Sequence, residues 1–272
     1  MVTTDLPLLG NPRSDRVRSV RALGRRAVRE RQGRFVVEGP QGVRELLRYA
    51  AGSARDLYVT AEAGELHTEI VAAAVVAGVR TWACTVEVLA AMADTPHPQG
   101  VLAVAEPVDV PLQAALGGLV AGYVVVLATV RDPGNAGTVI RGADAFGAAA
   151  VLVSDASVDV YNPKVVRSTA GSLFHLPVVV GLPVADLLEG CRAAGLRLLA
   201  ADGGGPTVLP EVDLSVPHAW VMGNEARGLD EEVLRACDDV VAVPIPGRAE
   251  SLNLAMAATV CLHASAAAGS GG

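Results

Sequence analysis

Hydrophobic and polar positions along the first hundred residues follow the pattern of a mixed α/β fold. Short β-branched runs are typical of buried strands, and apolar residues three or four positions apart are typical of amphipathic helices. After a loose lead-in over residues 1–14, the pattern predicts a basic helix from Asp15 to about Arg31, with Ser14 as its cap. It then predicts strands over 34–37, 56–60, 79–83 and 101–105, separated by helices over 41–50, 64–77 and 86–92. Such alternation indicates an α/β sandwich.

The pattern restarts after residues 106–111, where prolines and lost periodicity indicate a linker. It predicts strands over 123–128, 150–153, 178–180, 197–201, 219–222 and 240–243, with helices over 135–146, 164–171 and 184–194. This alternation predicts a parallel sheet covered on both faces. A last helix, opened by residues 251–253, is apolar nearly all round and should be buried on most faces. We therefore expect an N-terminal domain (1–107), a linker with a short helix (108–122), a second domain (123–267) and a disordered tail (268–272).

Residues 112–130 carry no charge and are numerous enough to cross a bilayer. Glycines at 117, 118 and 122 interrupt this segment, and its second half is a β-branched run typical of a buried strand. We predict a short helix, a glycine turn and a core strand instead of a membrane span. The N-terminus has Asp5, two early prolines and no apolar core, so it is not a signal peptide, and we expect a cytoplasmic protein.

Charge is spread unevenly along the 272 residues, whose formal net charge is −7. The stretch 13–34 holds nine arginines against Asp15 and Glu30, a net of +7, so the remainder carries −14. A basic arm on an acidic body is typical of localised nucleic-acid contact, with Arg21 and Arg25 as candidate RNA-binding residues. A solvated amphipathic helix explains the same charges, and charge alone does not decide between the two interpretations.

The four cysteines, at 84, 191, 237 and 261, lack C-x-x-C spacing. Together with the absence of a secretory signal, this predicts buried free thiols. The five histidines form no metal-ligand pattern, and we predict no metal.

Three loops that follow predicted strands carry polar residues in specific patterns. Residues 223–228 follow one strand, Pro244 to Glu250 follow another, and residues 129–134 lead into a helix that contains Arg141. Ligands of open α/β sheets bind beyond the carboxyl ends of the strands, so these loops predict a binding site. Ordinary structural roles are the alternative: Glu225 could cap a turn, Ser251 and Asn253 could begin a helix, and Arg141 could pair with Asp144 one turn away. Arg141, however, lies on a helix that looks mostly buried, so it needs a partner or a task.

These loops resemble the three motifs of the SpoU (TrmH-type) RNA ribose 2′-O-methyltransferases, in the SPOUT superfamily. The first motif, N-x-G-x-x-x-R-x-A, is similar to Asn135, Gly137, Arg141 and Ala143; the second, G-x-E-x-x-G, to Gly223, Glu225 and Gly228; the third to Pro244 and Ser251-Leu252-Asn253. The resemblance covers residues 123–264. A shorter match at residues 34–39 resembles the entry to the family's small α/β substrate-binding domain, whose fold is like that of RNA-binding ribosomal proteins.

The resemblance implies a parallel-sheet SPOUT domain with a deep trefoil knot that binds S-adenosylmethionine. The usual nucleotide-binding pattern G-x-G-x-x-G is absent from the chain. The implied catalytic residues are Arg141, Asn135, Glu225, Ser251 and Asn253. The implied cofactor-binding residues are Thr129, Gly223, Asn224, Val243, Ile245 and Leu252.

The family's substrate implies further contacts and partners. Lys164 and Arg167 are spaced to share one helix face and grip an RNA phosphate, although ordinary surface charges would look the same. The resemblance implies methylation of a ribose 2′-hydroxyl, with 23S ribosomal RNA favoured, by a homodimer that needs no metal. A transfer-RNA methyltransferase, an antibiotic-resistance enzyme and a catalytically silent RNA-binding homologue are alternatives. The intact motif residues speak against the last.

Overall fold

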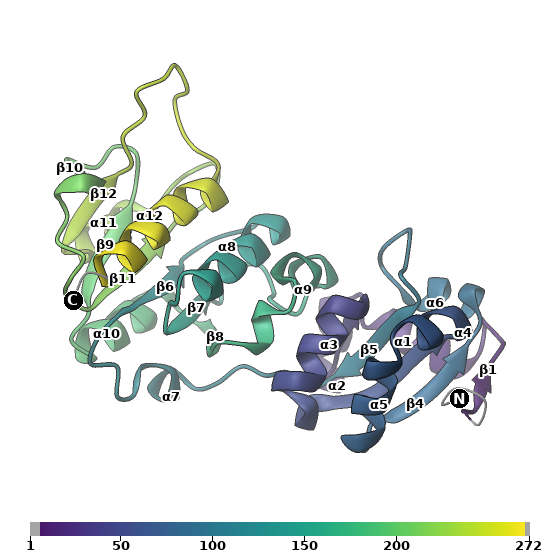
Figure 1. The fold of residues 1–272 in the computed structure, drawn as a ribbon. Coiled ribbons are helices and arrows are strands. Elements are labelled where there is room, and N and C mark those ends of the chain that lie inside the picture. The colour runs from purple at the N-terminus through teal and green to yellow at the C-terminus, as the bar shows by residue number, and fades with distance from the viewer. Residues whose placement is uncertain (1–5, 270–272) are drawn as a thin grey trace. The chain divides into compact units, whose positions relative to one another are not determined.

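The computed structural model describes residues 6–269, so parts of the expected lead-in and tail lie outside the described residues. The chain forms two compact units (Figure 1). The first contains the chain up to Val108 together with Tyr161–His175. The second contains Asp109–Val160 and the chain from Leu176 onward.

A five-stranded sheet, in the order β1-β4-β3-β5-β2, forms the centre of the first unit. Its strands are β1 (Leu8–Leu9), β2 (Phe35–Glu38), β3 (Ala54–Thr60), β4 (Arg80–Cys84) and β5 (Val101–Ala105). Strands β1, β4 and β3 run parallel, while β5 is antiparallel to both of its neighbours. The predicted α/β architecture is confirmed, but β1 was not expected, because the lead-in pairs with β4 instead of lying loose.

Side chains of this sheet alternate between two faces, and each face has its own helices. Val36, Tyr58 and Leu102 share one core with α1 (Asp15–Ala22), α2 (Arg26–Gln32) and α6 (Val86–Met92). Helices α3 (Pro40–Tyr49) and α5 (Thr68–Val76) pack on the opposite face, preceded by the short α4 (Ala61–Leu66).

The basic N-terminal segment forms two helices and not the single one predicted. Helix α1 ends at Ala22 and α2 begins at Arg26, with Gly24 between them. A glycine costs about 1 kcal/mol in a helix interior, and here the buried Arg29 donates to the Leu23 and Gly24 carbonyls, which the break leaves without helical partners. The predicted cap is confirmed, because the Ser14 hydroxyl accepts from the Val17 amide at 3.4 Å.

A seven-stranded sheet in the order β10-β12-β9-β11-β6-β7-β8 forms the centre of the second unit. All its strand pairs are parallel, as predicted. The strands are β6 (Tyr123–Leu127), β7 (Ala150–Ser154), β8 (Val178–Leu182), β9 (Arg197–Ala201), β10 (Thr207–Val208), β11 (His218–Met222) and β12 (Asp239–Ala242). Strands β6, β7 and β11 are buried along their whole length, because helices cover both faces. The trefoil knot stays a prediction.

Helices α7 (Leu112–Leu116), α10 (Val184–Ala193) and α11 (Glu231–Ala236) pack on one core of this sheet, and α8 (Pro133–Ala145) packs against α12 (Leu254–Gly269). The expected short helix, glycine turn and core strand within residues 112–130 are confirmed. Helix α11 was not predicted. Within residues 6–269, no helix has the length and apolarity to span a membrane.

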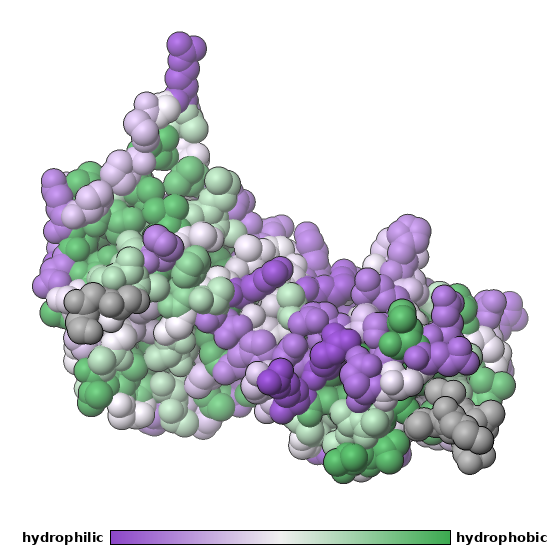
Figure 2. Space-filling view, viewed as in Figure 1, coloured by the Kyte–Doolittle hydropathy of each residue, from purple (hydrophilic) through white to green (hydrophobic). Residues whose placement is uncertain are grey.

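Helix α12 departs from its prediction in three ways. It begins at Leu254, so Ser251 and Asn253 precede it, and it continues through Ala268 and Gly269, which were expected in the tail. Met256 and Val260 are 60% and 40% exposed, so the helix is not buried on most faces. Figure 2 shows apolar side chains gathered around this helix on the second unit.

The segment Tyr161–His175 packs within the first unit although it lies between β7 and β8 of the second. It contains α9 (Pro163–Thr169). The Tyr161 ring lies 4.6 Å from that of Phe35, and its hydroxyl accepts from the Val108 amide at 2.8 Å. His175 lies 3.1 Å from the Glu45 carboxylate. Motif-based division of the sequence placed this segment wholly in the second domain.

The four cysteines are free thiols, as predicted, but only Cys84, Cys191 and Cys261 are buried, whereas Cys237 is half-buried. Burial raises the pKa of Cys84, Cys191 and Cys261 to about 12 each, so these thiols stay protonated and unreactive near neutral pH. Among residues 6–269 there is no group of three or more His, Cys, Asp or Glu side chains that could hold a metal ion.

Candidate active site

The loop after β11 makes a tight turn that depends on two glycines. Asn224 and Gly228 exchange backbone hydrogen bonds of 2.8 and 2.9 Å. Gly228 has a φ of 68°, which side-chain-bearing residues rarely adopt, and a Cβ on Gly223 would lie 2.5 Å from the Gly228 carbonyl oxygen. The spacing of these glycines therefore sets the shape of the loop.

Glu225 links this turn to the start of α8. Its carboxylate accepts hydrogen bonds from the amides of Arg131 at 3.3 Å and Asp132 at 3.1 Å, and from the Asn135 side chain at 3.2 Å. Burial opposes ionisation, but these hydrogen bonds to the charged form prevail and lower the pKa of Glu225. Glu225 thus orients the loops and is held as a carboxylate.

Asn253 connects the third loop to the same network. Its side-chain amide donates to Asn135 Oδ1 at 3.1 Å, and its Oδ1 accepts from the Ala255 amide at 2.9 Å, capping α12. The Asn224 side chain donates to the Thr129 carbonyl at 3.1 Å. Loops that follow β6, β11 and β12 are therefore joined through the side chains of Asn135, Asn224, Glu225 and Asn253.

A pocket of about 610 Å³ opens at the carboxyl ends of β9, β11 and β12. Seven predicted site residues line it: Gly223, Asn224, Glu225, Val243, Ile245, Ser251 and Leu252. Thr129 does not line the pocket but borders it through its hydrogen bond to Asn224.

Arg141 lies away from this network, on the outer side of α8. That helix buries Ala136, Val139, Ile140 and Ala143 but leaves Thr138 and Arg141 exposed. The Arg141 side chain forms no hydrogen bond or ion pair with any residue in 6–269, so the partner expected for a buried arginine is not found among these residues. A catalytic role for Arg141 stays a prediction.

The four predicted RNA-binding residues lie in the first unit and differ from one another. Arg167 of α9 pairs with Asp94 at 2.9 Å and Glu38 at 3.5 Å, so its charge is already neutralised. Lys164 is exposed on the same helix. The side chains of Arg21 and Arg25 are exposed and make no hydrogen bond or ion pair within the described chain, which leaves them accessible.

Both units match known sequence families. Residues 122–263 match the SpoU rRNA Methylase family, and residues 14–103 match the MRM3-like substrate binding domain. The chain belongs to the SpoU rRNA methylase family.

This SpoU methylase is similar to known methyltransferases over part or nearly all of its length. It is 31% identical over 257 residues to the 23S rRNA (guanosine(2553)-2′-O)-methyltransferase RlmP of Bacillus subtilis (strain 168), covering 92% of this chain and 96% of that protein. It is 44% identical over 137 residues to the 23S rRNA (uridine(2479)-2′-O)-methyltransferase of Streptomyces viridochromogenes, 48% of each chain. The AdoMet-bound rRNA methyltransferase from Sinorhizobium meliloti has a TM-score of 0.85 at 29% identity, covering 95% of this chain and 96% of that one.

Sequence reasoning missed several pocket residues of this SpoU methylase. Asp202 and Gly203 line the pocket from the loop after β9, and Glu250 lines it from the third loop. Asp202 directly follows a predicted strand of the same parallel sheet, a signal that could have identified it. All the charged lining residues, Asp202, Glu225 and Glu250, are acidic, so the pocket disfavours phosphate groups and suits a cationic ligand.

Proposed function

We propose that this SpoU methylase transfers the methyl group of S-adenosylmethionine to a ribose 2′-hydroxyl of 23S ribosomal RNA in the cytoplasm. The observation that carries the proposal is the pocket at the ends of β9, β11 and β12, joined by hydrogen bonds to Asn135 and Asn253 of the motif loops. The relatives from Bacillus subtilis and Streptomyces viridochromogenes, both named as 23S rRNA 2′-O-methyltransferases, support this substrate.

The lining residues fit S-adenosylmethionine. Val243, Ile245 and Leu252 offer apolar contact to an adenine ring, and the polar backbone of the Gly223 turn offers hydrogen bonds. The acidic lining suits a sulfonium, which carries a positive charge and, when bound, supplies an electrophilic methyl group. Thr129 and Asn224 hold the edge of the pocket.

Arg141 acts on the substrate hydroxyl in this proposal. An arginine is essentially always protonated, so it is a poor base, but it stabilises the negative charge that develops as the 2′-hydroxyl loses its proton. Its exposed side chain makes no hydrogen bond or ion pair in the described chain, so it is accessible to RNA. Asn135, Glu225, Ser251 and Asn253 orient the ribose and the loops, because positioning is a large part of catalysing a displacement.

A homodimer is part of the same proposal. Met256 and Val260 expose apolar surface on α12, which association of two copies would cover. We expect the protein to elute as a dimer and Met256→Glu to shift it toward monomer, as measured by light scattering. An unshifted dimer in this variant would exclude this face of α12 as the interface.

Transfer RNA is the second candidate substrate. A structure described as explaining 2-OH methylation of C/U34 on tRNA covers only 56% of this chain, whereas the ribosomal RNA relative from Bacillus subtilis covers 92%. The presence of the substrate-binding unit therefore favours ribosomal RNA.

The decisive experiment is methyl transfer from labelled S-adenosylmethionine to unmodified 23S ribosomal RNA, its fragments and bulk transfer RNA. We expect label on ribose of 23S ribosomal RNA. Label on transfer RNA alone would show that the substrate is transfer RNA and not ribosomal RNA. Cofactor binding without label on any RNA would contradict the proposed activity on free RNA.

A further inference from the structure

A polar pocket of about 400 Å³ lies in the first unit, between α1 and the face of the sheet that this helix covers. The strand register forms its floor, because Arg80 of β4 lies beside Asp56 of β3, and Asp56 lies beside Val104 of β5. The other lining residues come from α1, α2 and the start of β2: Asp15, Arg16, Ser19, Val20, Leu23, Gln32 and Arg34, with Tyr58 beneath.

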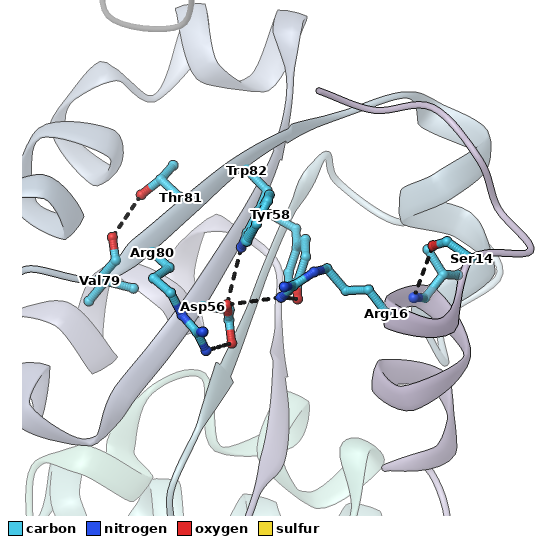
Figure 3. A network of polar contacts seen from close by, with 9 residues as sticks. Ser14, Arg16, Asp56, Tyr58, Val79, Arg80, Thr81 and Trp82 are labelled. Carbon is cyan, nitrogen blue, oxygen red and sulfur yellow. Dashed lines mark hydrogen bonds and ion pairs between the residues drawn. The ribbon is translucent and has the colours of Figure 1, made fainter. Parts of the chain in front are cut away.

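Asp56 is the centre of this pocket and is only 3% exposed. Its carboxylate accepts from Arg80 at 3.0 Å, from the Trp82 indole at 3.1 Å and from Arg16 at 3.4 Å (Figure 3). The Arg16 guanidinium also lies 4.0 Å from the centroid of the Trp82 ring, a cation–π contact. A buried carboxylate needs such partners, and in return it fixes the positions of Arg16 and Arg80.

The pocket contains more positive charge than the Asp56 carboxylate neutralises. Three arginines line the pocket against two aspartates, and Asp15 directs its carboxylate to Arg18. Arg34 is half-buried, and its side chain forms no hydrogen bond or ion pair with any residue in 6–269; its charge interacts only more weakly with Glu106, which pairs with Arg55. Arg80 uses one nitrogen on Asp56 and is 58% exposed, so its remaining donors face solvent.

A purely structural role, in which the network holds α1 against the sheet, would explain the contacts of Arg16. It would not explain why Arg34 and the solvent-facing nitrogens of Arg80 lie in the pocket. Arg21 of α1, Arg31 of α2 and Arg25 between the two helices are also exposed, which adds positive charge to the helices that line the pocket. Planar guanidinium groups are suited to bidentate contact with phosphate oxygens.

We propose that this pocket binds a phosphate group of the RNA substrate through Arg34 and Arg80, with Arg16, held by Asp56 and Trp82, as its third cationic wall. The inference rests on the proposed function, since it takes RNA as the substrate. The pocket holds the RNA backbone and adds affinity without reading sequence, because phosphate contacts position a nucleic acid and base contacts specify it.

The test compares the full chain with the double variant Arg34→Gln/Arg80→Gln in binding to unmodified 23S ribosomal RNA transcribed in vitro. Arg48→Gln is the matched control, because Arg48 is an exposed arginine of the same unit on α3, which packs on the opposite face of the sheet. We expect about tenfold weaker binding by the double variant, and a slope of log affinity against log salt that is smaller by about 1–2. The control should keep both the affinity and the slope.

Equal binding by the double variant and the unaltered protein would overturn the proposal, as would equal losses in the double variant and in Arg48→Gln. If Arg80→Gln prevents folding, the single variant Arg34→Gln tests the proposal, because the Arg34 side chain forms no ion pair in the described chain and its neighbour Glu106 keeps its pair with Arg55. Methyl transfer separates the two hypotheses. Absent transfer by the unaltered protein contradicts the proposed function, whereas normal transfer with an unchanged KM in the variant contradicts only the phosphate site.

Discussion

Two pockets of this chain, one in each unit, are built from different parts of a sheet and carry opposite charge. The candidate cofactor pocket of the second unit forms from loops beyond the strand ends, and its charged lining residues are all acidic. The pocket of the first unit forms from side chains on the face of a sheet, and three arginines line it. The first kind suits a small cationic ligand held largely by backbone groups, and the second suits an anionic polymer held by side chains.

The two pockets also differ in how visible they are in the sequence. Loops such as 223–228 carry their geometry in a short motif, because two glycines a few positions apart form one turn. The arginine pocket has no motif, because Arg16, Arg34 and Arg80 meet only after three strands and two helices have assembled. A site built by strand register therefore needs a structure to be found.

The largest effect is expected for Arg141→Ala. Removal of a charge-stabilising donor should lower kcat by about a hundredfold to a thousandfold, while affinity for S-adenosylmethionine measured by calorimetry stays the same. Arg235→Ala, an equivalent change at an exposed residue of α11, is the control and should keep full activity. Loss of cofactor binding in Arg141→Ala would assign this residue to the cofactor pocket instead.

A large loss of stability is expected for Asp56→Ala in the first unit. The change leaves Arg16, Arg80 and the Trp82 indole without their acceptor, and breaking such a buried network costs about 3 kcal/mol. Urea unfolding of the first unit measures the loss. Glu69→Ala removes an exposed carboxylate that pairs with Arg44, and it should cost less than about 1 kcal/mol. Similar costs for the two variants would show that the buried network does not hold α1 in place.

A smaller effect is expected for Gly223→Ala in the second unit. The added Cβ would lie 2.5 Å from the Gly228 carbonyl, so the turn must shift, at about 1–3 kcal/mol, and cofactor affinity should fall roughly tenfold or more. Gly247→Ala lies in the neighbouring loop, where an added Cβ meets nothing within 4 Å, and should bind normally. Unchanged affinity in Gly223→Ala would contradict the tight-turn description.

The smallest effect is expected for Glu225→Gln. Because hydrogen bonds lower the pKa of Glu225 in the fold, its stabilising effect is present above the ordinary value of 4.5 and is lost as pH falls through the folded pKa. Glutamine keeps one acceptor oxygen but loses the charge, so cofactor affinity near neutral pH should fall about fivefold. The decline in binding at acidic pH should weaken in the variant. If cofactor binding falls equally with acidic pH in both proteins, a group other than Glu225 causes the fall.

Most strands and the loops of the candidate site could be predicted because each depends on neighbouring residues. β5 and β9 have the predicted bounds, and the loops that carry Asn135, Glu225 and Asn253 meet beyond the strand ends, where the sequence predicted a binding site. Predictions that depended on distant partners did less well. Arg167 looked like a phosphate ligand, but Glu38 and Asp94, far away in the sequence, neutralise it.

Some errors arose within single helices. The helical pattern of residues 15–31 concealed the break at Gly24, because both halves keep their apolar residues toward the same core. The apolar composition of α12 suggested burial on most faces, whereas Met256 is exposed. Composition cannot distinguish a helix face buried within the chain from an apolar face that a second molecule would cover.

The placement of Tyr161–His175 has a practical consequence for dividing the protein. The chain passes between the two units three times, after Val108, after Val160 and after His175, so one proteolytic cut after Val108 splits the first unit and leaves Tyr161–His175 covalently attached to the second. A fragment that ends at Val108 would lack the Tyr161 and Phe174 rings that pack on Phe35 and would expose this apolar surface to water. Expression of the first unit by itself is therefore expected to give a poorly soluble fragment unless Tyr161–His175 is restored to it through a new linkage.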